Sequence, residues 1–534
     1  MPKCTINGHE VQVKDGATII EAMYGKGMPN EGEWTNGKVA HYCWHPGLSI
    51  AGVCRLCMVQ IEGNPRLQIA CNTVVTEGMK INNTSDAVKD AAKWGLDFHL
   101  INHPLDCPIC DQAGECGLQD QYMEFGKYNP EMAEKKVKKH KVVDLGPTVV
   151  LDTERCILCS RCVRFTDEVS KTEELGIFNR GDRSEIGTFD GKELNNNYSL
   201  NTVDICPVGA LTSKDFRFRQ RVWYLKDAET ICNGCSTGCN VKAYFNKEGF
   251  FRVKPVHNEK VNGYWMCDQG RDFYNFVNRE NRFLKAKKRT NSGWEEHQPG
   301  SLAKEMSFAV KSLGESVALV LTAQYTLEEF EAILSTFVND VKTKKIYHWD
   351  NNATTANEFD GLLIRGDKNP NTNGLKQALA KHGIMTQWND LISGINSGSI
   401  QTVVVAGPEN QMGYQDMKEK IQSLSKAKQL IWLQASKNKD LESVSGNICV
   451  IPMKSFVEKD GTFVNHAGLA QSFKKVTTVV SEALTLHEAG ELLAGKQLMI
   501  KPEINAFVES ARPADRVTME SRKKNEFVFR RGSL

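Results

Sequence analysis

Sixteen of the chain's seventeen cysteines lie within residues 1–267, and most of them occur in sets with short, regular spacings. A pair at C-x2-C places two thiolates on one tight loop, which suits a soft metal ion or an iron–sulfur cluster. In a reducing compartment such cysteines are more often metal ligands than disulfides. Four sets follow one another, and only Cys449 lies in the second half of the chain. We therefore expect a metal-binding N-terminal half and an ordinary globular C-terminal half.

The first set has the spacing C-x10-C-x2-C-x13-C and comprises Cys43, Cys54, Cys57 and Cys71. A loop closed by C-x2-C with one distant cysteine is typical of a plant-type 2Fe–2S centre, although the first gap is wider than usual. A structural zinc site also uses C-x2-C pairs, and the spacing leaves that alternative open. Upstream, "CTINGHEVQVKDGATIIEAM" predicts a strand, a turn, a strand and a short helix, the opening of a β-grasp ferredoxin-like module.

The second set lies in "HPLDCPICDQAGEC", residues 103–116, and comprises Cys107, Cys110 and Cys116. Three thiolates leave a four-coordinate site one ligand short, and His103 precedes the first of them by four positions. A histidine before a proline is more often a solvated loop residue, so these residues alone leave its role open. The helical apolar period of "SDAVKDAAKWGLDFHLI" predicts a helix that delivers the chain to His103.

The third set comprises Cys156, Cys159, Cys162 and Cys206, the last followed by proline. "CILCSRC" and "CPVGAL" are the two ends of a bacterial two-cluster ferredoxin, in which each run's fourth cysteine ligates the other run's cluster. The remaining cysteine positions of that pattern are occupied by Thr166, Asn196, Ser199 and Thr202. Losing these four together removes one complete cluster and leaves a full ligand set for the other, which favours 4Fe–4S over zinc.

The fourth set has the spacing C-x2-C-x3-C-x27-C and comprises Cys232, Cys235, Cys239 and Cys267. Alternation in "NVKAYFN" and "GFFRVKPV" predicts a small hairpin between the ligands. Four cysteines would again suit zinc, which stays as an alternative. Two cysteines remain outside the sets, Cys4 in the first expected strand and Cys449 in an apolar run, and we expect both to be small buried core residues.

Beyond about residue 285 the sequence changes to an α/β pattern. Short apolar runs predict strands, and amphipathic helices such as "TLEEFEAILSTFVNDVKTK" intervene, as in a mostly parallel sheet with helices on both faces. The runs are "SVALVLT", "KIYHW", "GLLIRG", "QTVVVAG", "QLIWLQA" and "NICVIPM". No G-x-G-x-x-G follows these runs and no P-loop is present, so nicotinamide and flavin sites are not evident.

Charge and hydropathy exclude several other classes. The formal net charge is only +2, which gives no indication of a nucleic-acid partner. No apolar run approaches the length that spans a bilayer, so no direct membrane insertion is expected. The polar N-terminus lacks the apolar core of a secretory signal, which predicts a cytosolic, reducing location.

With all four sets in this order, residues 1–280 resemble the large iron–sulfur subunit (the G subunit) of bacterial respiratory NADH:quinone oxidoreductase, complex I. The resemblance implies one 2Fe–2S cluster at the first set and 4Fe–4S clusters at the other three, with His103 as the fourth ligand of the second set. Only some members of the family have the fourth site. Because all four of its cysteines stand here, we expect this cluster to be loaded.

The back half resembles a shortened molybdopterin-oxidoreductase domain. "FVEKDGTFVNHAGLAQSF", residues 456–473, is similar to the GT-x-N-x-x-GR-x-Q stretch of that superfamily, but Leu469 replaces the arginine. The region is about half the length that a cofactor-bearing domain of this type needs, and no cysteine soon after Cys267 could ligate molybdenum. We therefore expect a scaffold without molybdopterin.

These interpretations combine into a multidomain chain of α+β and α/β parts. The expected domains are a 2Fe–2S β-grasp domain (1–85), a His/Cys3 4Fe–4S domain (86–145), a 4Fe–4S ferredoxin-like domain (146–225), a molybdopterin-oxidoreductase-type 4Fe–4S domain (226–284) and a cofactor-less α/β domain (285–534).

The resemblance implies an electron-transfer subunit of NADH:quinone oxidoreductase with no bond-making active site of its own. Single electrons would come from a flavin in the NADH-binding partner subunit and continue toward quinone. The other partners would be the remaining hydrophilic and membrane subunits. The location would be peripheral, on the cytoplasmic side of the inner membrane.

Two alternatives belong to other classes of protein. One is a diaphorase-type iron–sulfur subunit of a soluble NAD-linked hydrogenase or formate dehydrogenase, whose N-terminal cluster arrays are alike. The other is a zinc-stapled scaffold with no redox role, which iron and acid-labile sulfide analysis would distinguish.

Overall fold

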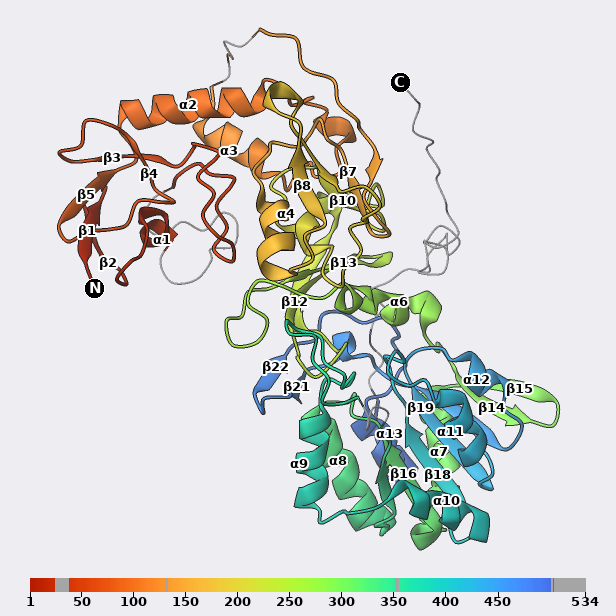
Figure 1. The fold of residues 1–534 in the computed structure, drawn as a ribbon. Helices are drawn as coiled ribbons and strands as arrows, with labels where there is room; N and C mark the ends of the chain where they lie inside the picture. The colour runs from red at the N-terminus through yellow and green to blue at the C-terminus, as the bar shows by residue number, and fades with distance from the viewer. Residues whose placement is uncertain (25–37, 128, 130–132, 351–354, 501–502, 504–534) are drawn as a thin grey trace. The chain divides into compact units, whose positions relative to one another are not determined.

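The computed structural model describes residues 1–24, 38–127, 129, 133–350, 355–500 and 503. The chain divides into two compact units, of which the first comprises residues 1–225 and the second begins at residue 226 (Figure 1). No helix among the residues described is long and apolar enough to cross a membrane.

The first unit begins with a five-stranded sheet in the order β2-β1-β5-β3-β4. β1 (Lys3–Ile6) and β2 (His9–Gln12) form a hairpin, and α1 (Ile19–Tyr24) follows. β1 also pairs in parallel with β5 (Met79–Asn82), while β3 (Met58–Ile61) and β4 (Gln68–Ile69) complete the sheet. The predicted strand, turn, strand and helix are confirmed, and Cys4 is buried in β1.

Two helices and a short 3-10 turn follow the sheet. α2 (Asp86–Leu100) confirms the helix predicted before His103, and it buries Val88, Ala92 and Leu96 along one face. η1 (Cys107–Ile109) and α3 (Gly117–Phe125) come next. The second ligand set therefore lies between α2 and α3, on a segment with little regular structure of its own.

The rest of the first unit is built on the three-stranded sheet β10-β7-β6. Its strands are β6 (Val143–Asp144), β7 (Val149–Leu151) and β10 (Leu211–Ser213). α4 (Arg161–Arg164) continues into the π-helix η2 (Phe165–Val169), and the hairpin β8 (Leu175–Phe178), β9 (Glu185–Thr188) and helix α5 (Asn201–Asp204) follow. Cys156 and Cys159 lie between β7 and α4, and Cys206 lies between α5 and β10.

The second unit opens with the antiparallel sheet β11-β12-β13. β12 (Asn240–Asn246) and β13 (Gly249–Pro255) confirm the predicted hairpin, and β11 (Lys226–Ile231) pairs with β12 on its other side. η5 (Gln269–Phe273) and α6 (Tyr274–Val277) then lead toward the α/β part.

The α/β part contains a seven-stranded sheet in the order β15-β14-β20-β19-β18-β16-β17. Five strands are parallel: β16 (Val317–Leu321), β17 (Ile346–His348), β18 (Thr402–Ala406), β19 (Gln429–Gln434) and β20 (Ile448–Pro452). The hairpin β14 (Ala286–Thr290) and β15 (Gly293–His297) adds an antiparallel edge. The predicted mostly parallel sheet is confirmed, and Cys449 is buried in β20 as expected.

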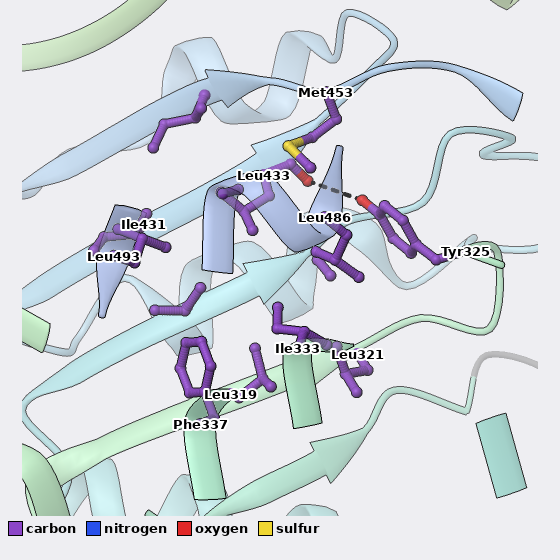
Figure 2. Close-up of a cluster of buried hydrophobic side chains, with 14 of the residues drawn as sticks. Leu319, Leu321, Tyr325, Ile333, Phe337, Ile431, Leu433, Met453, Leu486 and Leu493 are labelled. Carbon is purple, nitrogen blue, oxygen red and sulfur yellow. Dashed lines mark hydrogen bonds between the residues drawn. The ribbon is translucent and has the colours of Figure 1, made fainter. Parts of the chain in front are cut away.

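Helices cover both faces of this sheet. One core includes residues from α7 (Pro299–Lys311), α8 (Leu327–Thr336), α9 (Thr372–Lys381) and α13 (Leu486–Leu493). Figure 2 shows part of it, with Leu319 and Leu321 of β16 among side chains of the covering helices. The opposite core takes residues from α10 (Trp388–Ser397), α11 (Met417–Leu424) and α12 (Lys439–Ser443). Burial on both faces explains why these strands are continuously apolar.

One predicted strand is wrong. "GLLIRG", residues 361–366, is a loop, because the Oδ1 atom of Asp360 accepts hydrogen bonds from the backbone N–H groups of Leu362, Leu363 and Ile364, each at 3.0 Å. An aspartate that binds the following N–H groups offers the backbone an alternative to a strand ladder. This loop contributes to the fourth ligand site.

Candidate metal centres

The first set lies near β3 and β4 of the five-stranded sheet, and all four of its cysteines are buried. The Sγ atoms of Cys43 and Cys54 are 3.4 Å apart. Hydrogen bonds from the Cys54 and Cys71 thiols hold the pKa of Cys43 well below its usual range, and Cys71 likewise lowers the pKa of Cys57. Hydrogen bonding to Cys43 and burial raise the pKa of Cys54 and Cys71, so these two thiols stay protonated unless a metal replaces the proton. The structure thus brings the four predicted ligands together as one hydrogen-bonded group.

The second set borders an open pocket of about 500 Å³, which is lined by His103, Cys107 and Cys116 among others. The His103 ring is buried and held by a hydrogen bond between the Leu105 backbone N–H and Nδ1 (3.2 Å). Burial lowers the pKa of His103 to about 4, so the imidazole is neutral near pH 7, which is the form that ligates metals. These features fit a ligand better than a solvated loop histidine.

Cys110, the remaining member of the second set, does not line that pocket. Its Sγ atom lies against Gly209, where an added Cβ would stand only 2.2 Å away. The next segment is tied to the same stretch, because the Gly117 backbone N–H donates to the Pro207 carbonyl (2.9 Å). The loop after Cys206 of the third set thus supports the second set, and only glycine fits at position 209.

All four cysteines of the third set line one small pocket: Cys156, Cys159, Cys162 and Cys206. Leu158 and Ser160 have left-handed φ angles of 55° and 60°, which turn the loop tightly between successive cysteines. The Leu158 backbone N–H points at the Cys156 sulfur (3.4 Å). Burial raises the pKa of Cys156 to about 12, so this thiol stays protonated unless a metal replaces the proton.

A two-cluster ferredoxin would have four further cysteines at positions 166, 196, 199 and 202. The side chains that stand there in this chain make local hydrogen bonds. The hydroxyl of Thr166 donates to the Val163 carbonyl (2.9 Å), and that of Thr202 donates to the Ser199 carbonyl (2.7 Å). The Asn196 amide donates to Glu174 (3.0 Å). The structure thus pairs these side chains with the protein itself, which agrees with a single remaining cluster site in this ferredoxin-like part.

Two arginines beside the third set connect it to the other sets of the first unit. Arg155, next to Cys156, donates two hydrogen bonds to the carboxylate of Asp106 (2.9 and 2.7 Å), which precedes Cys107. These bonds hold the pKa of Asp106 at about 2. Arg161 donates to the backbone carbonyl of Trp44, which follows Cys43 (2.8 Å). The third ligand loop therefore contacts the ligand loops of both the first and the second set.

The fourth set, in the second unit, lines one small pocket with all four of its cysteines. Gly234 and Gly270 point backbone N–H groups at the sulfur atoms of Cys232 (3.4 Å) and Cys267 (3.3 Å). A Cβ at Gly270 would lie 3.0 Å from the Cys232 sulfur, so glycine leaves room there. N–H groups directed at sulfur stabilise the negative charge of a cluster.

Two segments of the α/β part clasp this fourth ligand loop. In loop 360–369, the Leu363 carbonyl accepts a hydrogen bond from the Thr237 hydroxyl, and the Asp367 carbonyl accepts one from the Ser236 backbone N–H. From residues 461–471, Gln471 donates to the Gly238 carbonyl (2.8 Å) and Asn465 donates to the Thr237 carbonyl (3.3 Å). Asn465 and Gln471 of the stretch that is similar to the molybdopterin-oxidoreductase motif thus bond the fourth ligand loop. Leu469, which stands where that motif has arginine, is partly exposed.

The donor sets fit iron–sulfur clusters. Among the described residues, no group of three or more His, Cys, Asp or Glu side chains is arranged to hold a metal ion by itself. In the third and fourth sets, all four cysteines line one pocket. Backbone N–H groups face sulfur in both sites, so the residues present suit 4Fe–4S groups.

Sequence reasoning missed the residues that support the ligands. Arg155, Arg161 and Gly209 each lie within three positions of a cysteine of the third set, yet spacing alone assigns them no partner. The only signal was the presence of two basic residues beside buried thiols. Gln471 lay within the motif noticed in the back half, but nothing in the sequence indicated that it contacts Gly238.

Four stretches of the chain match known families. Residues 3–86 match the 2Fe-2S iron-sulfur cluster binding domain, and residues 95–130 match the NADH-ubiquinone oxidoreductase-G iron-sulfur binding region. Residues 146–212 match the ferredoxin-like domain of NADH-quinone oxidoreductase subunit 3, and residues 225–279 match the molybdopterin oxidoreductase Fe4S4 domain. Each cysteine set thus overlaps an iron–sulfur family.

Individual proteins show the same relationship. The chain is 41% identical over 277 residues to the mitochondrial NADH dehydrogenase (ubiquinone) iron-sulfur protein 1 of Solanum tuberosum, covering 52% of this chain and 36% of that protein. It is 38% identical over 274 residues to the G subunit of NADH-quinone oxidoreductase from Rickettsia typhi, covering 51% and 39%. The G subunit of the Streptomyces coelicolor enzyme is 34% identical over 311 residues, covering 58% and 36%. The chain thus spans well under half the length of these relatives.

Proposed function

Since this chain is related over about half of its length to the G subunit of NADH-quinone oxidoreductase, we propose that it is an iron–sulfur electron-transfer subunit of such a complex. The observation that carries the proposal is the set of pockets lined by cysteines, each within a matching iron–sulfur family. The proposed ligands of a 2Fe–2S cluster are Cys43, Cys54, Cys57 and Cys71. Three 4Fe–4S clusters are proposed at the other sets. Their ligands are His103, Cys107, Cys110 and Cys116 in the second set, Cys156, Cys159, Cys162 and Cys206 in the third, and Cys232, Cys235, Cys239 and Cys267 in the fourth.

The bound clusters would accept and pass on single electrons, and the protein's part is to hold them, tune their potentials and exclude water. Arg155 and Arg161 tie the third ligand loop to the loops of the second and first sets. A relay through the first unit therefore need not follow the order of the sets in the sequence. Ten of the fifteen proposed cysteine ligands are buried, which limits the access of solvent to them; the half-buried ones are Cys107, Cys116, Cys156, Cys206 and Cys267.

The same proposal assigns the partners. Electrons would come from a flavin in an NADH-binding subunit and leave toward quinone through other hydrophilic and membrane subunits. The chain would lie at the cytoplasmic side of the membrane, attached through the complex. It would perform no bond-making chemistry itself.

For the α/β part we propose a scaffold that supports the fourth site without molybdopterin. In open α/β sheets, ligands bind beyond the carboxyl ends of the strands. Gln324, which follows β16, and Asn410, which follows β18, are both buried at this end of the sheet. The side-chain amide of Gln324 donates a hydrogen bond to the backbone carbonyl of Asn410 and accepts one from the backbone N–H of Asn410, both at 2.7 Å. Ser436, after β19, donates to the Glu409 carbonyl (2.7 Å). Polar side chains of the protein thus occupy this end of the sheet.

The decisive experiment is metal analysis of anaerobically purified full-length protein. We expect roughly 14 iron atoms with equivalent acid-labile sulfide per chain, a brown colour that bleaches with dithionite, and EPR signals of both cluster types. Cys206→Ser should remove the signal of one 4Fe–4S cluster, whereas Cys449→Ser, a buried cysteine outside the sets, should retain all signals. Zinc with little sulfide would overturn the proposal.

The partner assignment and the scaffold assignment have separate tests. With the flavin subunit present, NADH should reduce the clusters, and without it NADH should leave them oxidised. Elemental and pterin analysis should find neither molybdenum nor a pterin; a stoichiometric amount of either would contradict the scaffold assignment without affecting the electron-transfer proposal.

A further inference from the structure

Arg161 joins the ligand loops of two different sets through a single guanidinium group. It stands between Cys159 and Cys162 in the sequence and is only 5% exposed. Its Nη2 donates to the Trp44 carbonyl (2.8 Å), next to Cys43 of the first set, and its Nη1 donates to the Ile205 carbonyl (3.1 Å), next to Cys206 of the third set. One rigid planar group thus sets the spacing between the two ligand loops.

The charge of Arg161 is unusual among the buried arginines. Arg155 pairs with Asp106 at 2.7 Å, and Arg282 pairs with Glu458 at 2.6 Å. Arg161 makes no ion pair with a carboxylate among the residues that the structure describes, and its Nε atom is buried without an acceptor. A buried cation is costly unless an anion compensates it. Two proposed cluster ligands, Cys159 and Cys162, lie within two positions of Arg161 in the sequence.

We propose that Arg161 is a positioning residue and shared counter-charge for the first and third clusters. Its two carbonyl contacts hold the ligand loops at a fixed separation, and its positive charge favours the addition of an electron to either cluster. This inference rests on the proposed iron–sulfur function. It goes beyond that function because it names one side chain that couples two centres.

The geometry explains why arginine suits this position. A guanidinium presents several N–H donors in a fixed plane and can bond two acceptors in different directions, whereas a lysine ammonium is a point charge on a flexible stem. Arg164, one helical turn later, is less buried and bonds the Cys43, Ser49 and Cys159 carbonyls. Arg164 thus also bonds backbone of both sets, but only within the local Cys156–Cys162 run of the third set. Arg161 differs because it bonds the Ile205 carbonyl beside the distant ligand Cys206.

The test compares Arg161→Gln and Arg161→Lys in the full chain, purified anaerobically with its clusters. Iron and sulfide content, EPR-monitored midpoint potentials and the magnetic interaction between the two reduced clusters are measured. Arg161→Gln should lower the midpoints of both the first and the third cluster. Arg161→Lys should retain most of the potential but weaken or broaden the magnetic interaction, because the charge remains while the double contact is lost.

Two controls separate this role from a general effect. Arg183→Gln removes an exposed arginine from the same unit and should leave all midpoints unchanged. The cluster of the fourth set, in the other unit, is an internal reference whose midpoint should not move in any variant. If the Gln variant loses iron, a loss confined to the first and third clusters supports the positioning role.

Several outcomes would overturn the inference. Unchanged midpoints and an unchanged magnetic interaction in a fully loaded Arg161→Gln protein would exclude both the charge effect and the positioning role. An equal loss of iron from all four sets would indicate a general folding defect. By contrast, a parent protein without iron and sulfide would refute the proposed function itself, so the two failures are distinguishable.

Discussion

The two units support their candidate cluster sites in different ways. In the first unit, most strands have two to four residues, and the ligand loops are joined to one another by side chains such as Arg155 and Arg161. In the second unit, a sheet with strands β16, β18, β19 and β20 buried along their whole length supports a single ligand loop from outside. From this comparison we expect the proposed metal sites to contribute more to the stability of the first unit, and the large apolar core to contribute more to that of the second.

Removing the clusters should reveal the largest difference in stability between the two units. Anaerobic chelation of iron should unfold much of the first unit, because ligand binding contributes free energies on the order of 10 kcal/mol to the folding of small metal domains. The sheet of the second unit should persist. Hydrogen exchange should therefore show rapid exchange in β1, β5 and β7 and retained protection in β16 to β20. Equal loss of protection in both units would contradict the difference.

The reverse experiment weakens the apolar core. Phe337 is fully buried in the core shown in Figure 2. Phe337→Ala should lower the free energy of unfolding of the second unit by about 3–5 kcal/mol, since it removes a large side chain and leaves a cavity. The EPR signals of the first unit's clusters should not change. Phe308→Ala, on an outward face of α7 and 79% exposed, is the matched control and should have little effect on denaturant unfolding.

A smaller change should act within the first unit on one set alone. Gly209→Ala would place a Cβ 2.2 Å from the Cys110 sulfur, so the ligand or its loop must move. We expect a cost of about 1–3 kcal/mol, as for other overpacked sites, and selective loss of the second cluster in iron analysis and EPR. Gly187→Ala meets only the Phe178 ring, at 3.3 Å, and should keep all clusters. Full retention of the second cluster in Gly209→Ala would show that the loop adapts.

The clasp in the second unit offers a comparable test. Gln471→Ala removes the hydrogen bonds to the Gly238 carbonyl (2.8 Å) and from the Asn240 amide (2.7 Å). Leaving these buried groups without a partner should cost about 1–2 kcal/mol and make the fourth cluster easier to lose during oxidation or chelation. Ser472→Ala, exposed on the same strand, is the control. The loss rate of iron from the fourth site measures the effect, and equal rates in both variants would exclude a supporting role.

The finest comparison concerns ligand chemistry rather than stability. The second set offers a histidine, whereas the fourth offers four cysteines. His103→Cys replaces a neutral ligand by a thiolate, so adding an electron becomes less favourable and the midpoint of the second cluster should fall, as the effect of histidine ligands in Rieske centres implies. A redox titration followed by EPR measures this, with the fourth cluster as an unaltered reference. A raised midpoint would show that hydrogen bonding or exposure outweighs charge.

Much of the local structure could be predicted because its signals are local. The alternation of β12 and β13, the apolar runs of β16, β18, β19 and β20, and the period of α2 all lie within single short segments. The segment 361–366 could not be predicted in this way. It has the apolar character of a strand, but hydrogen bonds to Asp360 and contacts with the distant Thr237 make it a loop.

Short cysteine spacings by themselves indicated the C-x2-C core of each candidate set, because ligands on one tight loop must be close in sequence. The distant member Cys206 came from the ferredoxin pattern, and His103 came from the family resemblance. The loss of four cysteine positions around Thr166 and Thr202 likewise indicated a single surviving cluster without reference to the fold. Only the tertiary structure decided which residues support these ligands. Arg161 bonds the carbonyl of Trp44, 117 residues away, and Gln471 bonds that of Gly238, 233 residues away. Such contacts depend on how separate segments pack, and no local spacing encodes them.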